Sequence, residues 1–138
     1  MRVVLDTNLL CSALITPGGP ADQLYLAWRA RLFTLVTSEE QLEEFRRVTR
    51  YPRVKRFIES TAAGTMHNEL RRLAMLLTDL PAIEASADPG DNFLLAMTLA
   101  GDADFLVTGD KRDLLSMGTF RRTRIVTARE MLRELGQG

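Results

Sequence analysis

The chain has 138 residues, of which 46% are hydrophobic and 26% charged, the composition of an ordinary folded domain. Lys plus Arg and Asp plus Glu each total 18, so no overall net charge attracts the molecule to nucleic acid or to a membrane. We expect a single cytoplasmic domain over residues 1–138, because a signal-peptide pattern and a membrane-length apolar run are absent and Cys11 is the only cysteine.

The first predicted strand, residues 2–5, is followed directly by the polar residues Asp6, Thr7 and Asn8. A short continuous apolar run is typical of a buried parallel strand, and ligands bind at the carboxyl ends of such strands. Asp6 is therefore a candidate catalytic residue. A second interpretation stays open, in which Asp6 or Thr7 only caps the helix predicted over residues 8–15.

A second helix, over residues 21–31, and a second strand, over residues 32–36, are predicted next. Ser38 and Gln41 have the spacing of a capping box, so we expect a third helix to begin at Glu39. Ser38 thus lies where a strand gives way to a helix.

Glu44 lies on the flank of the apolar stripe that Leu42, Phe45 and Val48 form at about 100° per residue. From this position its carboxylate can serve a site at the edge of the sheet. The alternative is an ion pair with a neighbouring arginine and no further role. Position alone does not decide between the two.

Six cations lie between residues 46 and 56 with no acid among them, and Tyr51-Pro52 interrupts the helix in the middle of the group. Such a cluster is a candidate for contact with RNA phosphates. A solvated face and a patch covered by an acidic partner are equally compatible with it. The six residues are Arg46, Arg47, Arg50, Arg53, Lys55 and Arg56.

Apolar residues then continue at helical spacing from Val54 to Leu77, with Gly64 as the point that divides two helices. His67, the only histidine, lies off this stripe, and we interpret it as a surface residue rather than a metal ligand. Residues 80–84 are predicted to form a short edge strand.

The next helix is predicted to be buried, because residues 93–100 are apolar nearly all round. Asp88 suits its N-cap and Pro89 its first turn. Asp91 also lies in the first turn, where the helix dipole favours a carboxylate by only about 0.3–1 kcal/mol. That gain is too small to explain acids at the start of a buried helix, so Asp91 is a second candidate site residue.

The strand predicted over residues 105–108 is again followed by a carboxylate, Asp110. A helix over residues 111–116, a strand over residues 125–126 and a last helix capped by Thr127 complete the chain. Strands that alternate with helices indicate an α/β fold with a parallel sheet.

The acids after these strands, Asp6 and Asp110, can converge with Asp91 at one edge of such a sheet, and Glu44 can approach from the helix after the second strand. Several carboxylates close together repel and take up protons unless cations join them. Mg²⁺ or Mn²⁺ suits these oxygen ligands, whereas Zn²⁺ is disfavoured without Cys or His ligands.

With these motifs the chain resembles the PIN-domain ribonucleases, close to the single-domain prokaryotic toxins of toxin–antitoxin pairs (VapC-like). The resemblance extends over essentially the whole chain, and its specificity comes from the order and spacing of four motifs. The matching pieces are Val-Val-Leu-Asp-Thr-Asn at residues 3–8, Ser38 with Glu44-Phe45, Asp-Pro-Gly-Asp-Asn at residues 88–92, and Leu-Val-Thr-Gly-Asp at residues 106–110 with Leu114-Leu115 after it.

The resemblance implies a three-layer α/β/α sandwich with a central, mostly parallel five-stranded sheet. It also implies metal-dependent hydrolysis of RNA, an antitoxin protein as a partner, and a homodimer. The implied catalytic and metal-binding residues are Asp6, Glu44, Asp91 and Asp110, with Asn8, Ser38, Asn92 and Asp88 as supporting polar groups.

Two other functions remain open on the residues. A non-catalytic module of the same fold would bind RNA or protein without cleaving it. A phosphatase-like hydrolase would use Asp6 as a covalent nucleophile, although Asn8 stands where an Asp-x-Asp pattern has its second acid.

Overall fold

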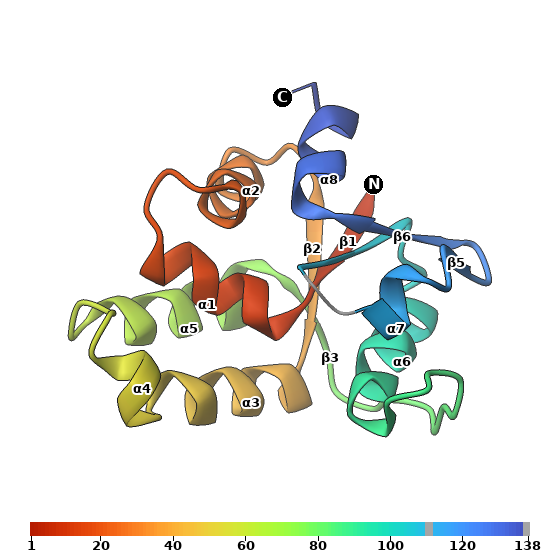
Figure 1. Cartoon of the computed structure of the whole chain (residues 1–138), viewed down its shortest axis with the longest axis horizontal. Helices are drawn as coiled ribbons and strands as arrows, with labels where there is room; N and C mark the ends of the chain where they lie inside the picture. The colour runs from red at the N-terminus through yellow and green to blue at the C-terminus, as the bar shows by residue number, and fades with distance from the viewer. Residues whose placement is uncertain (110–111, 137–138) are drawn as a thin grey trace.

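Residues 1–109 and 112–136 are described by a computed structural model, in which a central sheet carries helices on both faces (Figure 1). The strand order is β3-β2-β1-β4-β6-β5, and every neighbouring pair is parallel except β5 and β6. The strands are β1 (Arg2–Leu5), β2 (Thr34–Ser38), β3 (Met75–Leu77), β4 (Phe105–Thr108), β5 (Thr119–Phe120) and β6 (Thr123–Thr127).

The helices divide between the two faces of the sheet, as the three-layer prediction requires. Side chains of α1, α2, α3, α5 and α8 pack on one face, and those of α6 and α7 on the other. None of the helices in the described residues is long and apolar enough to cross a membrane. They are α1 (Thr7–Ile15), α2 (Pro20–Arg29), α3 (Glu39–Thr49), α4 (Pro52–Lys55), α5 (Ala62–Leu73), α6 (Asn92–Ala100), α7 (Arg112–Leu115) and α8 (Ala128–Glu134), with a 3₁₀ turn η1 (Pro89–Asp91) before α6.

The central strand β1 is buried on both faces. Val3 and Leu5 pack into the core under α1 and α2, whereas Val4 packs against α6 on the opposite side. Alternate side chains of a strand point to opposite faces, so a strand covered on both sides needs a continuous apolar run. This confirms the α/β/α sandwich and puts the carboxyl end of β1 at the centre of one sheet edge.

The sheet has six strands rather than five, and the prediction was wrong at both of its edges. Residues 75–77, expected to continue a helix, form β3 and pair with β2, while residues 80–84 form no strand. A run of three apolar residues fits a helix or a strand equally well, so periodicity could not separate the two. The two-residue strand β5 was too short to be recognised from its sequence.

The middle of the chain also departs from the predicted helices. Residues 56–61 separate α4 from α5, so the helical pattern from residue 54 is broken earlier than expected, and Gly64 lies inside α5 instead of dividing two helices. Leu26, an apolar residue within α2, is 57% exposed. Helical spacing alone did not identify the buried side, because tertiary packing decides which apolar residues are covered.

Helix α6 is anchored at the amino edge of the sheet, which fixes the direction of its other end. The guanidinium of Arg2, at the start of β1, donates to the Gly101 carbonyl at 3.1 Å. A Cβ at Gly101 would lie 2.8 Å from Cγ1 of Val36, so the helix end packs directly on β2. The first turn of α6, with Asp91, therefore lies toward the carboxyl edge, where β1 and β4 end.

Replacing Gly101 by Ala should destabilise the protein by about 1–3 kcal/mol, because the new methyl group must displace buried Val36. Urea unfolding measures the change. Gly64→Ala is the matched control: no atom lies within 4 Å of its Cβ position, and this helical site should gain about 0.5–1 kcal/mol from the change. Equal effects of the two substitutions would contradict the close contact between α6 and β2.

Candidate functional site

Asp6 is 2% exposed and connects three elements at the carboxyl edge. Its Oδ1 accepts a hydrogen bond from the Asn8 backbone N–H at 3.2 Å and so caps α1, while Asn8 itself is exposed. Its Oδ2 accepts from the Thr108 hydroxyl at 2.8 Å, at the end of β4. Asp6 is thus a helix cap, as one interpretation had it, but only one of its oxygens makes the capping bond.

Gln41 has a second role that sequence reasoning missed. Ser38 accepts a hydrogen bond from the Gln41 backbone N–H at 3.1 Å, so Ser38 caps α3 as predicted, but the Gln41 side chain does not complete the predicted capping box. The Gln41 side chain, however, donates to the Leu5 carbonyl at 2.6 Å and accepts from the Thr37 hydroxyl at 2.7 Å. It is 1% exposed and joins the ends of β1 and β2. The capping-box spacing explained Gln41 locally, so no signal in the sequence indicated this longer contact.

Glu44 and Asp6 act on the same side chain, the buried Cys11 of α1. Burial, and then the negative charges of Glu44 and Asp6, raise the pKa of the Cys11 thiol to about 12. Both carboxylates therefore lie within electrostatic range of Cys11, and Glu44 belongs to α3, which packs on α1. Glu44 also lies 4.0 Å from the Arg47 guanidinium, a partly exposed pair of a kind that contributes little to stability.

Asp91 is 2% exposed at the start of α6, so its burial agrees with the sequence argument. Asp88 is exposed and accepts a hydrogen bond from the Gly90 N–H at 2.9 Å, which makes it a local cap. The side-chain oxygen of Asn92 accepts from the backbone N–H groups of Ala85 and Ser86 at 3.2 and 2.9 Å. Asn92 thus holds the loop before α6 and has a structural role.

The fourth predicted acid, Asp110, lies outside the described residues. Within residues 1–109 and 112–136, no three Asp, Glu, His or Cys side chains gather closely enough to hold a metal ion. Asp6 and Asp91 still supply buried carboxylate oxygens, the donors that Mg²⁺ and Mn²⁺ prefer. The complete set of four ligands, Glu44 and Asp110 included, remains a prediction.

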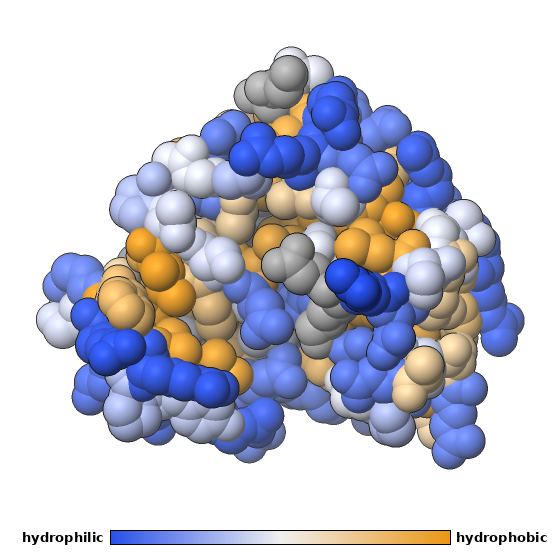
Figure 2. Space-filling model, in the orientation of Figure 1, coloured by the Kyte–Doolittle hydropathy of each residue, from blue (hydrophilic) through white to orange (hydrophobic). Residues whose placement is uncertain are grey.

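All six cations of the predicted RNA-binding cluster are exposed, but they do not form one surface. Figure 2 shows hydrophilic side chains gathered over α3 and α4. Arg46, Arg50 and Lys55 line a groove of about 360 Å³ between α3, α4 and α5. Arg47 lies instead beside Glu44.

The two remaining cations stack on aromatic rings. Arg53 lies 5.9 Å from the ring centre of Tyr51, and Arg56 lies 4.8 Å from that of Phe57. His67 is half-buried in the same groove, where burial and nearby Arg46 lower its pKa. The prediction of a surface histidine was therefore only partly right.

A family model described as a PIN domain matches residues 2–112 of this chain. The match begins at β1 and includes the positions of all four predicted acids. A search of curated proteins finds no match.

Replacing Gln41 by Met should reduce the free energy of unfolding by about 1–3 kcal/mol, because the buried Leu5 carbonyl and Thr37 hydroxyl lose a partner. Gln23→Met is the control. The Gln23 side chain also donates to a carbonyl, that of Gly18 at 2.9 Å, but it is exposed, so a change within about 0.5 kcal/mol is expected. Urea denaturation compares the two. A neutral Gln41→Met variant would show that the bridge between β1 and β2 is dispensable.

Proposed function

The chain belongs to the PIN-domain family, and from this premise we propose that it is a Mg²⁺- or Mn²⁺-dependent ribonuclease that hydrolyses RNA phosphodiester bonds. Nuclease-type activity is general in this family, as are divalent metal ions and RNA as a substrate. The choice of RNA hydrolysis with these two ions is the finer step that we propose for this chain.

The observation that best supports the proposal is the environment of Asp6. One of its oxygens is used to begin α1, and the other is oriented by Thr108 at the end of β4. Glu44, on α3, lies within electrostatic range of Cys11 of α1. A carboxylate that serves only as a cap is satisfied at the surface, whereas Asp6 is buried among the ends of two central strands.

The donor set suits a hard divalent cation. Asp6, Asp91, Glu44 and Asp110 would hold it, directly or through water, since all four offer carboxylate oxygens. When bound, such an ion supplies a nucleophilic water of lowered pKa and stabilises the charge on the leaving oxygen. Thr108 orients Asp6, and Gln41 keeps the end of β1 beside the end of β2.

We further propose that this nuclease is the toxin of a toxin–antitoxin pair, with an antitoxin protein as its partner. The support is the resemblance of the motifs to single-domain toxins of the PIN family. Arrest of bacterial growth on expression, relieved by a small protein from the neighbouring gene, would support the role. A chain that cleaves RNA without harming its host would be a nuclease of another kind.

Asp6→Asn should lower Mg²⁺- or Mn²⁺-dependent RNA cleavage at least about a hundredfold, because a neutral amide is a poor ligand for a hard cation. Asn caps a helix as well as Asp does, so the variant should keep its fold. Asp88→Asn, at the exposed cap of η1, should retain activity.

The measurement is cleavage of a labelled RNA with and without EDTA, with circular dichroism to check folding. If Asp6→Asn cleaved RNA as fast as the wild type, the role of Asp6 would be limited to capping α1. RNA binding without cleavage by the wild type would indicate a non-catalytic module. Release of phosphate from a phosphomonoester, with RNA left intact, would favour the phosphatase-like alternative.

Changing Arg46, Arg50 and Lys55 to Gln should weaken RNA binding and reduce the slope of log Kd against log salt by about 0.7 for each lost contact with single-stranded phosphate. Binding is measured in EDTA over roughly 50–200 mM salt. A control triple variant, Arg121, Arg124 and Arg133 to Gln, removes the same charge elsewhere and should leave the slope nearly unchanged. Equal slopes in the two triple variants would show that the groove does not contact RNA.

A further inference from the structure

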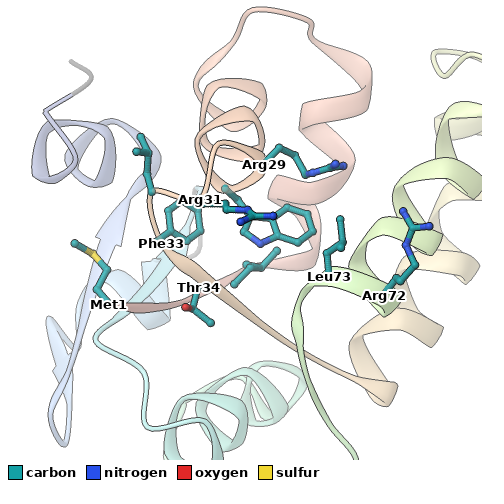
Figure 3. Close-up of a pocket in the computed structure, with 10 residues that line it drawn as sticks. Met1, Arg29, Arg31, Phe33, Thr34, Arg72 and Leu73 are labelled. Carbon is teal, nitrogen blue, oxygen red and sulfur yellow. The ribbon is translucent and has the colours of Figure 1, made fainter.

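A second cavity, of about 670 Å³, lies at the amino edge of the sheet, the edge opposite to Asp6 (Figure 3). It is formed where β1 and β2 begin and where α2 and α5 end. Figure 3 shows Arg29 on α2 and Arg72 on α5 at the same side of the cavity, with Leu73 beside them. Its volume lies in the range of about 300–1,000 Å³ that is typical of small-molecule sites.

The charged residues that line this cavity are arginines. Arg29, Arg31 and Arg72 line it, and none of the described lining residues is acidic. Glu69, outside the lining, pairs with Arg29 and also lies within electrostatic range of Arg72. Arg31 is therefore the lining guanidinium best placed to attract an anion, and a guanidinium matches phosphate with two parallel hydrogen bonds.

The rest of the lining is apolar and partly aromatic. Trp28 and Phe33 are each 6% exposed and belong to its buried part. Leu32 and Leu73, exposed by 44% and 49%, leave apolar surface around the opening. A suitable ligand therefore combines an anionic group with a flat or apolar body.

Arg31 occupies a backbone position that normally favours glycine. Its φ is +66°, its N–H donates to the Trp28 carbonyl at 2.8 Å, and the Leu32 N–H donates to the Ala27 carbonyl at 3.0 Å. These two bonds form a Schellman motif after α2, in which the left-handed residue is usually Gly because a Cβ is strained there. An arginine at this point puts a guanidinium at the cavity at some cost to the backbone, which is what a binding role for the side chain would explain.

We propose that this cavity binds an aromatic phosphate of mononucleotide size, with the phosphate on the arginines and the base over the apolar surface. The cavity and Asp6 of the candidate nuclease site lie at opposite edges of the sheet. The proposal therefore does not depend on nuclease activity.

The test is a titration of the full chain with AMP and UMP in EDTA, followed by calorimetry and by backbone amide NMR. A nucleotide should bind saturably, and adenosine or inorganic phosphate alone at least about tenfold more weakly, because each provides only half of the contacts. The amide shifts should cluster at residues 28–35 and 72–73. The phosphate can belong to a free nucleotide or to the 5′ end of an RNA, and a 5′-phosphorylated hexanucleotide distinguishes the two. Tighter binding of the hexanucleotide than of AMP assigns the site to an RNA end, and weaker binding assigns it to a free nucleotide.

The decisive variant is Arg31→Gly, which should weaken nucleotide binding at least about tenfold while the thermal midpoint stays equal or rises, because the backbone strain is relieved. Arg121→Gly is the matched control. It removes the same charge and the same kind of strain, at φ +54°, outside the cavity, and should bind like the wild type. The proposal would be overturned if Arg31→Gly still bound nucleotide as the wild type does, or if the wild type bound neither AMP nor UMP. Amide chemical-shift changes confined to the surroundings of Asp6 would overturn it as well.

Discussion

A buried carboxylate must be compensated by hydrogen bonds or cations, because removing its charge from water costs several kcal/mol. In this protein the constraint falls on Asp6, which is almost fully covered at the end of the central strand. Its two oxygens accept from the start of α1 and from the end of β4. The same group therefore sets the entry of the first helix and the position of Thr108, on which the candidate site is built.

The strand ends at the two edges of the sheet are connected by different kinds of interaction. At the amino edge Asp104 accepts from the Arg2 N–H at 2.7 Å and pairs with Arg122, and these partners hold the pKa of its carboxyl below its usual value. At the carboxyl edge neutral groups, Gln41 and the hydroxyl of Thr37, connect the strands. Charged pairs thus connect the strand ends at one edge, while neutral hydrogen bonds connect β1 and β2 at the opposite edge.

Helix α3 separates acid from base at the candidate site. Glu44 lies within electrostatic range of Cys11 on α1, whereas Arg46 and Arg50 line the groove toward α5. Like charges therefore do not crowd one surface, and cations reach the neighbourhood of the acids mainly through Arg47. The flank of α3 that lines the groove thus presents positive charge, apart from the Glu44–Arg47 pair.

The sequence by itself determined the α/β class with a parallel sheet and the caps at Ser38 and Thr127, because apolar runs and bonds between near neighbours are local properties. The capping role of Asp6 was left open, and the sandwich came from the family resemblance. Strand β3 was missed, since three apolar residues carry no periodicity. Only the tertiary structure decided that Thr108 contacts Asp6, 102 positions away, and that Gln41 contacts Leu5, 36 positions away. Such contacts depend on which strands become neighbours, and chain folding, not local pattern, makes that choice.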